Sequence, residues 1–388
     1  MSGYDWRAAL SEVMPSVVSW RRALHRRPEL SSHEKETRAF IMDRLAEMGI
    51  PCRTFEGCYA VMATLRNGEG PCVAIRADMD ALPVTEQTGL PFASEVPGVM
   101  HACGHDTHMA MALGSALWLS THLEAWHGTV KWLFEPEEET VGGGQKMVAQ
   151  GCMEAPDVDC VIGQHVDPAR PAGIFHAKSG AVSGSSDELR LTVRGTGCHG
   201  AYPEKGVDAI VLTAQIVTAL QTLVSRSISP FQPAVITFGT VEGGKANNII
   251  ADEVRLTGTL RTLDAETRAF LRKRIAEVCE GIARSLGGSA ELTIVPSYGA
   301  VINDERFYQV IEAQASSICG QVVTRPAPSL GVESFCYFED HTPGVYYDLG
   351  SGPSTALHSP TMVVDEDVLY YGVAMQCASV IGLTEAIA

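Results

Sequence analysis

Three short apolar runs constrain the fold of this chain more than any other feature. Acidic residues follow the first two runs, and a glutamine and a histidine follow the third. The runs are Cys72–Ala77, Gly128–Phe134 and Cys160–Gly163. Each has the length and composition of a buried strand, and a helical segment, Thr107–Thr121, lies between the first two. Because α/β sheets place their sites at the ends of buried strands, the sequence predicts an α/β domain with a site at these ends, where Gln164 and His165 follow the third strand.

The pattern changes near Ser183, where the expected elements follow the order β-α-β-β-α-β of a small ferredoxin-like domain. The expected elements are Asp187–Arg194, Val207–Ser225 (helix), Ala234–Val241, Glu253–Thr262, Ala265–Leu286 (helix) and Ala290–Val295. A chain of 388 residues is longer than one hydrophobic core usually supports, which also favours two domains. We therefore expect a discontinuous first domain, residues 1–182 and 296–388, with a second domain, residues 183–295, inserted into it.

Composition and charge narrow the class of protein. The net charge of −17 and the pI near 5.1 argue against nucleic acid or an anionic membrane as a partner, since both would repel this surface. The eleven cysteines lack CxxC pairs and the dense spacing of a secreted scaffold, so reduced thiols in the cytoplasm are expected. The N-terminus does not read as a signal peptide, and the longest apolar stretch, Ala209–Val224, is interrupted by threonines and glutamines. We therefore expect a soluble cytoplasmic protein.

The segment His101–His108, HACGHDTH, brings three imidazoles, a thiol and a carboxylate into eight residues. A lone histidine is more often a surface or core residue, but this density favours a site. Gly104 permits a tight turn, so that Cys103 and His105 can converge on one metal ion. The remaining polar side chains of the segment are expected to support the metal-binding imidazoles: Asp106 and His108.

A run of three glutamates, Glu137–Glu139, follows the second buried strand and precedes Gly142–Gly144. A charge run is usually a solvated face, but this position favours a site in which one carboxylate binds metal while its neighbour faces the attacking water. A thiolate, imidazoles and a carboxylate suit a zinc-like divalent ion. Together with His165, and with His358 in the loop after the expected strand Gly344–Leu349, these residues indicate a metal-dependent hydrolase.

Seven motifs occur in order and together resemble the metallopeptidase amidohydrolase family. They are RADMDALP (Arg76–Pro83), HACGHDTH (His101–His108), FEPEEE (Phe134–Glu139), GQHVDP (Gly163–Pro168), GCHGAYPEKGVDAI (Gly197–Ile210), GKANNIIAD (Gly244–Asp252) and ALHSP (Ala356–Pro360). This family includes hippurate hydrolase, indole-acetyl-amino-acid hydrolases and N-acetyldiaminopimelate deacetylase, and is related to aminoacylase and dinuclear-zinc carboxypeptidases. The resemblance spans Leu24 to His358. It implies a zinc-peptidase-like catalytic domain, with a mixed sheet flanked by helices, and an inserted ferredoxin-like lid or dimerisation domain.

The resemblance also implies a role for each matching residue. Two divalent metal ions per subunit would be held by Cys103, His105, Glu139, His165 and His358. Glu138 would be the general acid/base, and Asp80 would orient the metal site. In the second domain, His199 and Asn248 would reach an active site, often that of the partner subunit, to contact substrate and oxyanion. Arg261 is a candidate for the substrate carboxylate, with an ordinary strand arginine as the alternative.

The implied reaction is hydrolysis of the amide bond of an N-acyl amino acid, with an acetyl, benzoyl or similar acyl group, or of a short peptide, by a homodimer. Zinc is the first choice of metal, with manganese, cobalt and nickel as alternatives. Dipeptidase or carboxypeptidase activity at the same site is an alternative function. Two rivals also stay open: a thiol hydrolase with Cys103 as nucleophile and His105 as base, and a non-catalytic metal-dependent binding protein.

The sequence departs from the usual pattern of this family at several positions. Glu137 stands where a small residue is common, and Ser334 stands where an acidic residue is frequent. Lys245 and Asn247 alter a loop of the second domain. None of these positions is a proposed ligand or the proposed base. Because Glu137 and Lys245 change the charge of loops expected to meet the substrate, they bear on substrate preference.

Overall fold

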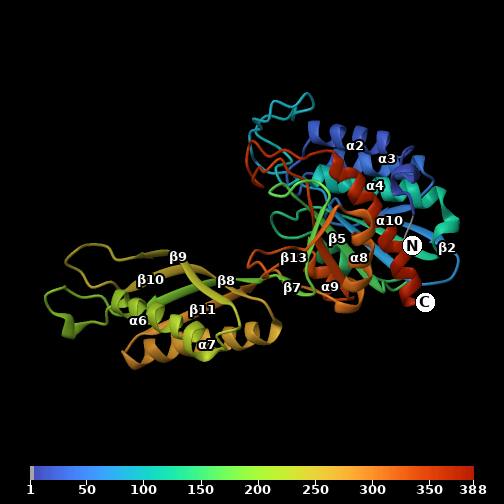
Figure 1. Cartoon of the computed structure of the whole chain (residues 1–388). Helices are drawn as coiled ribbons and strands as arrows, with labels where there is room; N and C mark the ends of the chain where they lie inside the picture. Colours follow the sequence, from blue (N-terminus) through green and yellow to red (C-terminus); the bar gives the residue numbers. More distant parts are fainter. Residues whose placement is uncertain (1–3) are drawn as a thin grey trace. The chain divides into compact units, whose positions relative to one another are not determined.

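The computed structural model describes residues 4–388, which divide into two compact units (Figure 1). Unit 1 comprises residues 4–182, 302–327 and 334–388, and unit 2 comprises residues 183–301 and 328–333. Two chain segments therefore return to complete unit 1 after the chain has passed through unit 2.

Unit 1 is built on an eight-stranded mixed sheet with the strand order β1-β2-β4-β3-β5-β14-β6-β13. Its strands are β1 (Cys52–Thr54), β2 (Val61–Asn67), β3 (Cys72–Asp78), β4 (Gly128–Glu135), β5 (Cys160–Asp167), β6 (Ile174–Ala177), β13 (Gln321–Thr324) and β14 (Gly344–Gly350). The four central strands, β4, β3, β5 and β14, are mutually parallel, so their carboxyl ends meet at one edge of the sheet. Antiparallel pairs flank them, with β2 beside β4 and β6 beside β14. The predicted α/β class with a mixed sheet is confirmed.

Strand β5 is longer than the sequence indicated. We expected it to end at Gly163, but it continues to Asp167, so the prediction that His165 follows the strand is wrong. The reason is the parallel ladder with β14, which pairs residue for residue from Gly344↔Val161 to Gly350↔Asp167 and so extends the strand through polar residues. His165 is therefore held by a strand rather than by a loop.

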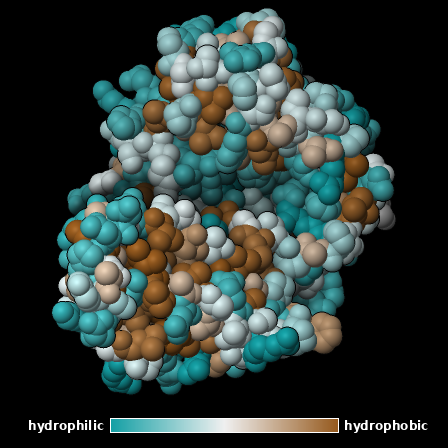
Figure 2. Space-filling model, turned by 90° about the vertical axis from the view of Figure 1, so that its left-hand side faces the viewer, coloured by the Kyte–Doolittle hydropathy of each residue, from teal (hydrophilic) through white to brown (hydrophobic). Residues whose placement is uncertain are grey.

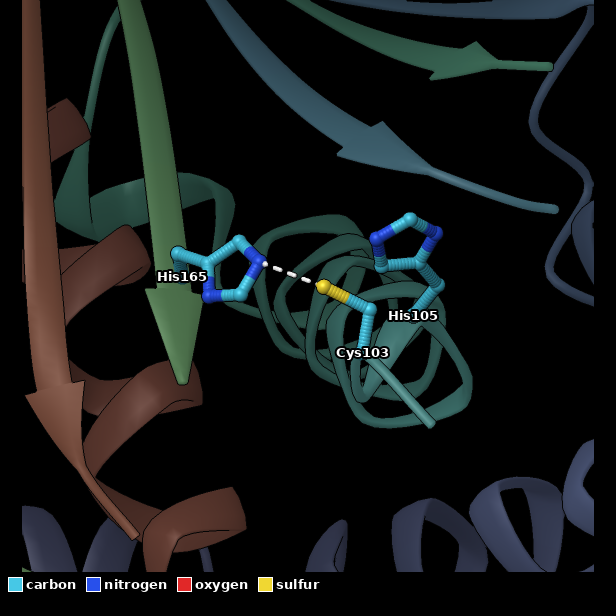
Figure 3. Close-up of side chains that lie close together, drawn as sticks. All are labelled: Cys103, His105 and His165. Atoms are coloured by element: carbon cyan, nitrogen blue, oxygen red, sulfur yellow. Dashed lines mark hydrogen bonds between the residues drawn. The ribbon is translucent and has the colours of Figure 1, made fainter. Parts of the chain in front are cut away.

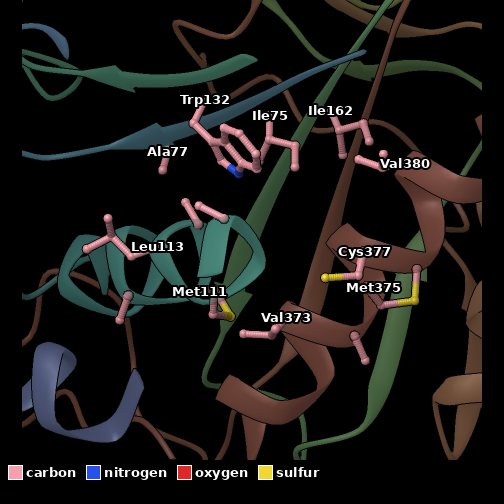
Figure 4. Close-up of a cluster of buried hydrophobic side chains, with 14 of the residues drawn as sticks. Ile75, Ala77, Met111, Leu113, Trp132, Ile162, Val373, Met375, Cys377 and Val380 are labelled. Atoms are coloured by element: carbon pink, nitrogen blue, oxygen red, sulfur yellow. The ribbon is translucent and has the colours of Figure 1, made fainter. Parts of the chain in front are cut away.

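Helices cover both faces of the sheet of unit 1. They are α1 (Trp6–Ala9), α2 (Met14–Arg26), α3 (Lys35–Glu47), α4 (His105–Thr121), α5 (Gly144–Ala149), α8 (Glu305–Ile318), α9 (Cys336–Glu339) and α10 (Asp367–Ile387), with a 3-10 turn, Leu123–Ala125. Helices α2, α3, α4 and α10 lie together over one face (Figure 1). Successive strand residues point to opposite faces. Ile162 of β5 faces α10 (Figure 4). Its neighbour Gly163 is therefore on the opposite face of the sheet, where it lies close to Phe335, the residue before α9.

The main hydrophobic core of unit 1 lies between β3, β4 and β5 and the helices α4 and α10 (Figure 4). Ile75, Trp132 and Ile162 of the sheet face Met111 of α4 and Val373 of α10, and all five side chains are buried. Burying one apolar side chain of this size contributes about 1.5–3 kcal/mol to stability. Because α4 is buried on nearly all sides, its first residue, His105, is held in a fixed place at the end of the sheet.

Unit 2 has a four-stranded antiparallel sheet in the order β11-β8-β10-β9, with two helices connecting its strands. Its elements are β8 (Ser185–Arg194), a 3-10 turn (Pro203–Lys205), α6 (Ala209–Thr222), a π-helical turn (Leu223–Ser227), β9 (Ala234–Gly243), β10 (Glu253–Thr262), α7 (Ala265–Ser285) and β11 (Ser289–Pro296). This is the predicted β-α-β-β-α-β order. The strand expected at Glu253–Thr262 has those bounds in the structure, and Asp208 caps α6 by accepting bonds from the first helical amides.

The limits of unit 2 differ from the expected range 183–295. Strand β11 continues its pairing with β8 as far as Pro296↔Asp187, so residue 295 lies inside a strand. A second segment, residues 328–333, also belongs to unit 2, and the Gly184 amide donates to the Gly331 carbonyl at 2.8 Å. The separate strands β7 (Gly180–Ser183) and β12 (Val301–Asn303) pair only with each other in the described part of the chain.

One helical stretch among the described residues, Ala209–Ser227, is long and apolar enough to span a membrane by length and composition, with a mean hydropathy of 1.3. In the structure, Leu212, Ile216 and Leu220 of this stretch are buried in the core of unit 2. Packing of one helix face on a sheet explains the apolar composition without a membrane, and a single such helix is weak evidence of a span.

Candidate metal centre

Cys103, His105 and His165 come together at the carboxyl end of the central strands (Figure 3). Gly104 adopts a left-handed conformation with a φ of 84°, and a Cβ at this position would lie 2.4 Å from Val166 Cγ2. Only glycine fits such a turn without strain, and the turn brings the side chains before and after it to one side. The Cys103 Sγ lies 3.4 Å from His165 Nε2, and His165 Nδ1 lies 2.8 Å from the Val166 carbonyl. That second contact fixes the ring and leaves Nε2 directed at the thiol.

Glu139 and His358 complete this cluster from two further segments. Glu139 Oε1 lies 3.3 Å from His358 Nε2 and 3.9 Å from His105 Nε2. His358 sits in a loop with a φ of 63°, and its amide donates to the Ala102 carbonyl at 2.8 Å. This backbone bond ties the C-terminal loop to the segment that carries Cys103.

The ligand atoms form three overlapping groups, and within each group all atoms lie within 4.8 Å of one another. The groups are Cys103–His105–His165, Cys103–Glu139–His358 and His105–Glu138–Glu139. All five predicted ligands and the predicted base are therefore brought together. Cys103, His105 and Glu139 each belong to two groups, which is the arrangement expected when neighbouring ions share a site.

The chemistry of these donors fits a divalent metal. The buried Nε2 of His105 has no hydrogen-bond partner among the described residues, and the carboxylate oxygens of Asp78 and Glu139 lie 3.7 Å and 3.9 Å from it. Buried polar atoms are normally satisfied, so orphaned atoms of this kind point to a missing partner such as an ion. A thiolate, imidazoles and a carboxylate are the ligands that zinc and similar ions prefer.

Asp80 lies directly behind this cluster. Its Oδ1 is 3.4 Å from His105 Nδ1 and accepts the Glu138 amide at 3.1 Å, while its Oδ2 accepts the Glu139 amide at 3.0 Å. Burial would raise the pKa of Asp80, but the contact with His105 overcomes it and the pKa is lowered. One ionised carboxylate thus contacts the His105 imidazole and holds the loop that carries Glu138 and Glu139.

Asp78 and His108 form a second carboxylate–imidazole pair beside the cluster. The Val166 amide donates to His108 Nε2 at 2.9 Å, so the ring proton lies on Nδ1, which is 2.6 Å from Asp78 Oδ1. Asp78 Oδ2 is 3.7 Å from His105 Nε2. We did not single out Asp78 from the sequence, although its spacing of two from Asp80 at a strand end was an available signal.

Burial and neighbouring charges shift the pKa values of the residues in this site. Burial raises the pKa of Asp78, but His105, His108 and Arg76 outweigh it and hold the pKa well below its ordinary value. Burial would lower the pKa of His105, but Asp78 and the neighbouring groups raise it well above its ordinary value. Burial raises the pKa of the Cys103 thiol, and a bound cation would oppose that effect because coordinating thiols are deprotonated.

Three predicted residues lie in unit 2. His199 and Asn248 are exposed and lie in adjacent loops, where the Gly200 amide donates to the Asn248 carbonyl at 2.7 Å. The ring of His199 is oriented by the Ala201 amide, which donates to its Nδ1 at 3.1 Å. Arg261 is half-buried in β10, opposite Ser186 and Val235 of the neighbouring strands.

One sequence expectation is wrong in detail. Asp106 does not support a predicted metal ligand, because its carboxylate lies 2.8 Å from Arg21 Nε and 2.9 Å from His25 Nδ1. Glu137 is 2 % exposed, and its carboxylate contacts Ser32 and Lys146. Lys245 is exposed, and its Nζ pairs with Asp252 at 2.9 Å.

Another cluster of acidic and histidine side chains, Asp167, His176 and Asp348, has ligand-like spacing. Two guanidinium groups already enter it: Arg170 pairs with Asp167, and Arg325 pairs with Asp348. Because these cations neutralise the carboxylates and would repel an ion, the cluster is an ion-pair network.

A mixed β-sheet with thiol, imidazole and carboxylate donors at the carboxyl ends of its central strands indicates the class of protein, a metal-dependent hydrolase. The family follows from comparison with known sequences. Residues 74–381 match the model of the peptidase family M20/M25/M40, and the chain belongs to this family.

Individual relatives give the same family over nearly the whole chain. The N-acetyl-L-cysteine deacetylase of Bacillus subtilis is 37% identical, over 93% of this chain and 86% of its own length. The thermostable carboxypeptidase 2 of Saccharolobus solfataricus is 35% identical, over 94% of each. A solved structure from Bacillus subtilis, described as a dinuclear metal-binding peptidase of the M20 family, is 32% identical with a TM-score of 0.86, covering 97% of this chain and all (100%) of that one.

Proposed function

We propose that this chain is a metal-dependent amidohydrolase that cleaves the amide bond of N-acyl amino acids. The observation that carries the proposal is the convergence of five potential ligands from four separate segments, with Glu138 beside them. The residues proposed to hold two divalent ions are Cys103, His105, Glu139, His165 and His358. Zinc is the proposed metal, with manganese, cobalt and nickel as the alternatives that metal analysis would separate.

Two bound divalent ions would supply Lewis acidity, which polarises a substrate carbonyl and lowers the pKa of a water. In the proposed reaction, Glu138 takes the proton from the attacking water and returns it to the leaving amine. Asp80 holds the amides of Glu138 and Glu139, so the base stays beside the ligand groups. His199, Asn248 and Arg261 are proposed to contact the oxyanion and the substrate carboxylate.

The substrate class is proposed from the relatives. One is named for deacetylation of N-acetylcysteine, which favours a small acyl group on an amino acid. Another is named a carboxypeptidase, so peptidase activity at the same site is the second candidate. The two differ in what lies on the acyl side of the bond, an acyl group or a peptide, and a substrate panel distinguishes them.

A thiol hydrolase is the rival mechanism, and one geometric observation favours it. The Cys103 thiol lies 3.4 Å from an imidazole, although this belongs to His165 rather than to the expected His105. Against it, burial raises the pKa of the thiol, which disfavours the nucleophilic thiolate in a metal-free site. It also leaves Glu139 and His358 without a role in the reaction.

The deciding experiment measures amine release from N-acetyl, N-benzoyl and N-succinyl amino acids and from N-blocked dipeptides. The assay is run before chelation, after chelation and after restoration of one metal at a time. Hydrolysis that disappears and returns with the metal supports the proposal, whereas hydrolysis that survives chelation but not thiol alkylation supports the thiol mechanism. Inactivity towards the whole panel with two metals bound would favour a binding protein.

The proposed base has its own test. Glu138→Gln removes the proton acceptor with little change in volume, so kcat is expected to fall by roughly 10²–10⁴-fold. The metal content per chain should stay the same. The matched control is Glu277→Gln, which changes an exposed glutamate of unit 2 and should leave kcat unchanged. Turnover near wild type in Glu138→Gln would contradict the assignment.

We also propose a homodimer formed through unit 2. Figure 2 shows hydrophobic residues grouped in patches on the molecular surface. The exposed hydrophobic residues of unit 2 include Ile210, Val211 and Val241. Strand β9 ends the sheet order, so one of its edges is available to pair with a second copy. Ile210→Asp is expected to give monomers in sedimentation equilibrium, and an unchanged mass would contradict this interface.

All eleven cysteines are free thiols, which supports the proposed cytoplasmic location.

A further inference from the structure

The loop Glu137–Glu139 is held by buried carboxylates at three consecutive backbone amides. The Glu137 amide donates to Glu34 Oε1 at 2.9 Å, and the next two amides donate to the two oxygens of Asp80. Glu34 is fully buried, with 0 % exposure. Breaking a hydrogen bond between a buried carboxyl oxygen and an amide is costly, because both groups would be left without a partner. The backbone that presents Glu138 and Glu139 is therefore fixed by Glu34 and Asp80.

The side chain of Glu137 adds a second set of contacts. One carboxylate oxygen accepts a hydrogen bond from the Ser32 hydroxyl at 2.9 Å, and the other accepts one from the Lys146 ammonium at 2.7 Å. Lys146 also donates to the Gly57 carbonyl at 3.2 Å, which anchors it to another loop. Glu137 has a φ of 62°, a left-handed conformation that residues with a side chain rarely adopt. These contacts oppose relaxation of that backbone.

One short N-terminal segment supplies most of the anchors. Ser31 donates to Asp80 Oδ2 at 2.6 Å, and the next residue, Ser32, contacts Glu137. The Ala81 amide donates to the Glu29 carbonyl at 2.8 Å, which fixes this segment beside the loop that follows β3. This segment thus holds both Asp80, which is 49 residues from Ser31, and the three-glutamate loop, in which Glu137 is 105 residues from Ser32.

We propose that Glu137 is a positioning residue for the base Glu138, with Ser32 and Lys146 as the partners of its side chain and Glu34 as the acceptor of its amide. The proposal rests on the function proposed above, because it assigns a cause to the orientation of the base. If Glu137 turned to an ordinary backbone conformation, the peptide that leads into Glu138 would rotate and displace its carboxylate. A misplacement of about 1 Å can cost roughly 10²-fold in rate.

The test compares Ser32→Ala and Glu137→Gln with matched controls elsewhere on the full-length chain. Ser11→Ala and Glu277→Gln serve as controls, because both change exposed residues far along the chain from the loop. We expect kcat to fall by roughly 10- to 100-fold in the test variants. KM should stay within about threefold, and both metals should be retained, because the substrate and the ligands are unchanged.

A background variant separates positioning from a general loss of structure. Glu138→Asp shortens the side chain and so already displaces the carboxylate. Adding Glu137→Gln to this variant should therefore lower kcat much less than Glu137→Gln lowers it in the wild type. A merely structural role predicts equal fold-losses in the two backgrounds. Parallel loss of metal content, thermal stability and kcat in Ser32→Ala would also overturn the proposal, as would unchanged kcat.

Hydrogen exchange gives a readout that does not depend on turnover. In the metal-loaded and the chelated protein, the peptide covering residues 137–142 should exchange faster in Ser32→Ala and Glu137→Gln than in the controls. Unchanged exchange in both variants would overturn the anchoring. If the wild type hydrolysed nothing on the panel, the proposed function would fail while the exchange data still decided the anchoring. If Glu137→Gln did not fold, Ser32→Ala and Lys146→Met would decide, since each removes a single partner.

Discussion

His25 is a buried histidine of α2 whose charged form is stabilised by two carboxylates. Its Nδ1 lies 2.9 Å from Asp106 Oδ2 and its Nε2 lies 3.3 Å from Glu86 Oε1, and the residue is 1 % exposed. Burial would lower the pKa of His25, and the charge of nearby Arg21 acts in the same direction. Asp106 and Glu86 outweigh both and raise the pKa from 6.5 to about 9. Protonation of His25 should therefore stabilise unit 1.

The size of this effect follows from the difference between the two pKa values. The step from 6.5 to about 9 corresponds to about 3 kcal/mol, at about 1.36 kcal/mol per pH unit. Because the folded state binds the proton more tightly than the unfolded state, the stabilisation is complete below pH 6.5. It is lost as the pH rises through 9.

Urea unfolding of the chelated protein measures this effect, since chelation removes the pH dependence of metal binding. All five tryptophans lie in unit 1, so their fluorescence reports the unfolding of that unit alone. His25→Gln should reduce the unfolding free energy by about 3 kcal/mol more at pH 6 than at pH 9.5. His341→Gln, which changes an exposed histidine, should show no such difference. An equal cost of His25→Gln at both pH values would refute the reasoning.

Three glycines give further predictions. Gly372→Ala would place a Cβ 1.8 Å from Met111 Sδ, so urea unfolding should show a loss of about 1–3 kcal/mol. Gly281→Ala, in α7 with no atom within 4 Å of the new Cβ, should instead stabilise unit 2 by about 0.5–1 kcal/mol, and a loss there would contradict the helix-propensity argument. Gly104→Ala combines a left-handed φ with a 2.4 Å approach to Val166 Cγ2, so metal titration should show weaker binding; unchanged affinity would mean that this turn does not position the ligands.

Much of the fold could be predicted because local patterns coincide with burial. Glu253–Thr262 alternates and forms a strand with those bounds, and the buried run Cys72–Ala77 forms β3. Strand β5 was underestimated, since the polar residues that extend it are held by pairing with β14 rather than by their own composition. Pairing partners distant in sequence leave no signal in a local window.

The candidate site shows the same division. Cys103 with His105, and Glu138 with Glu139, stand in dense local clusters that the sequence displays directly. Glu34 directly precedes α3, and no sequence pattern around it indicates a bond to the Glu137 amide. Contacts across a hundred residues depend on how strands and helices pack, so they could not be found from spacing.

The sequence by itself determined the types of metal-binding side chain, their order along the chain, and the presence of two domains of different architecture. These properties depend on composition and on short-range periodicity, which the chain carries in every conformation. The tertiary structure decided which donors share a site, that Asp106 pairs with Arg21 and His25, and that Glu137 is enclosed rather than exposed. Distance and burial arise only when distant segments pack together, because a charged side chain can be buried only where a partner offsets the loss of water.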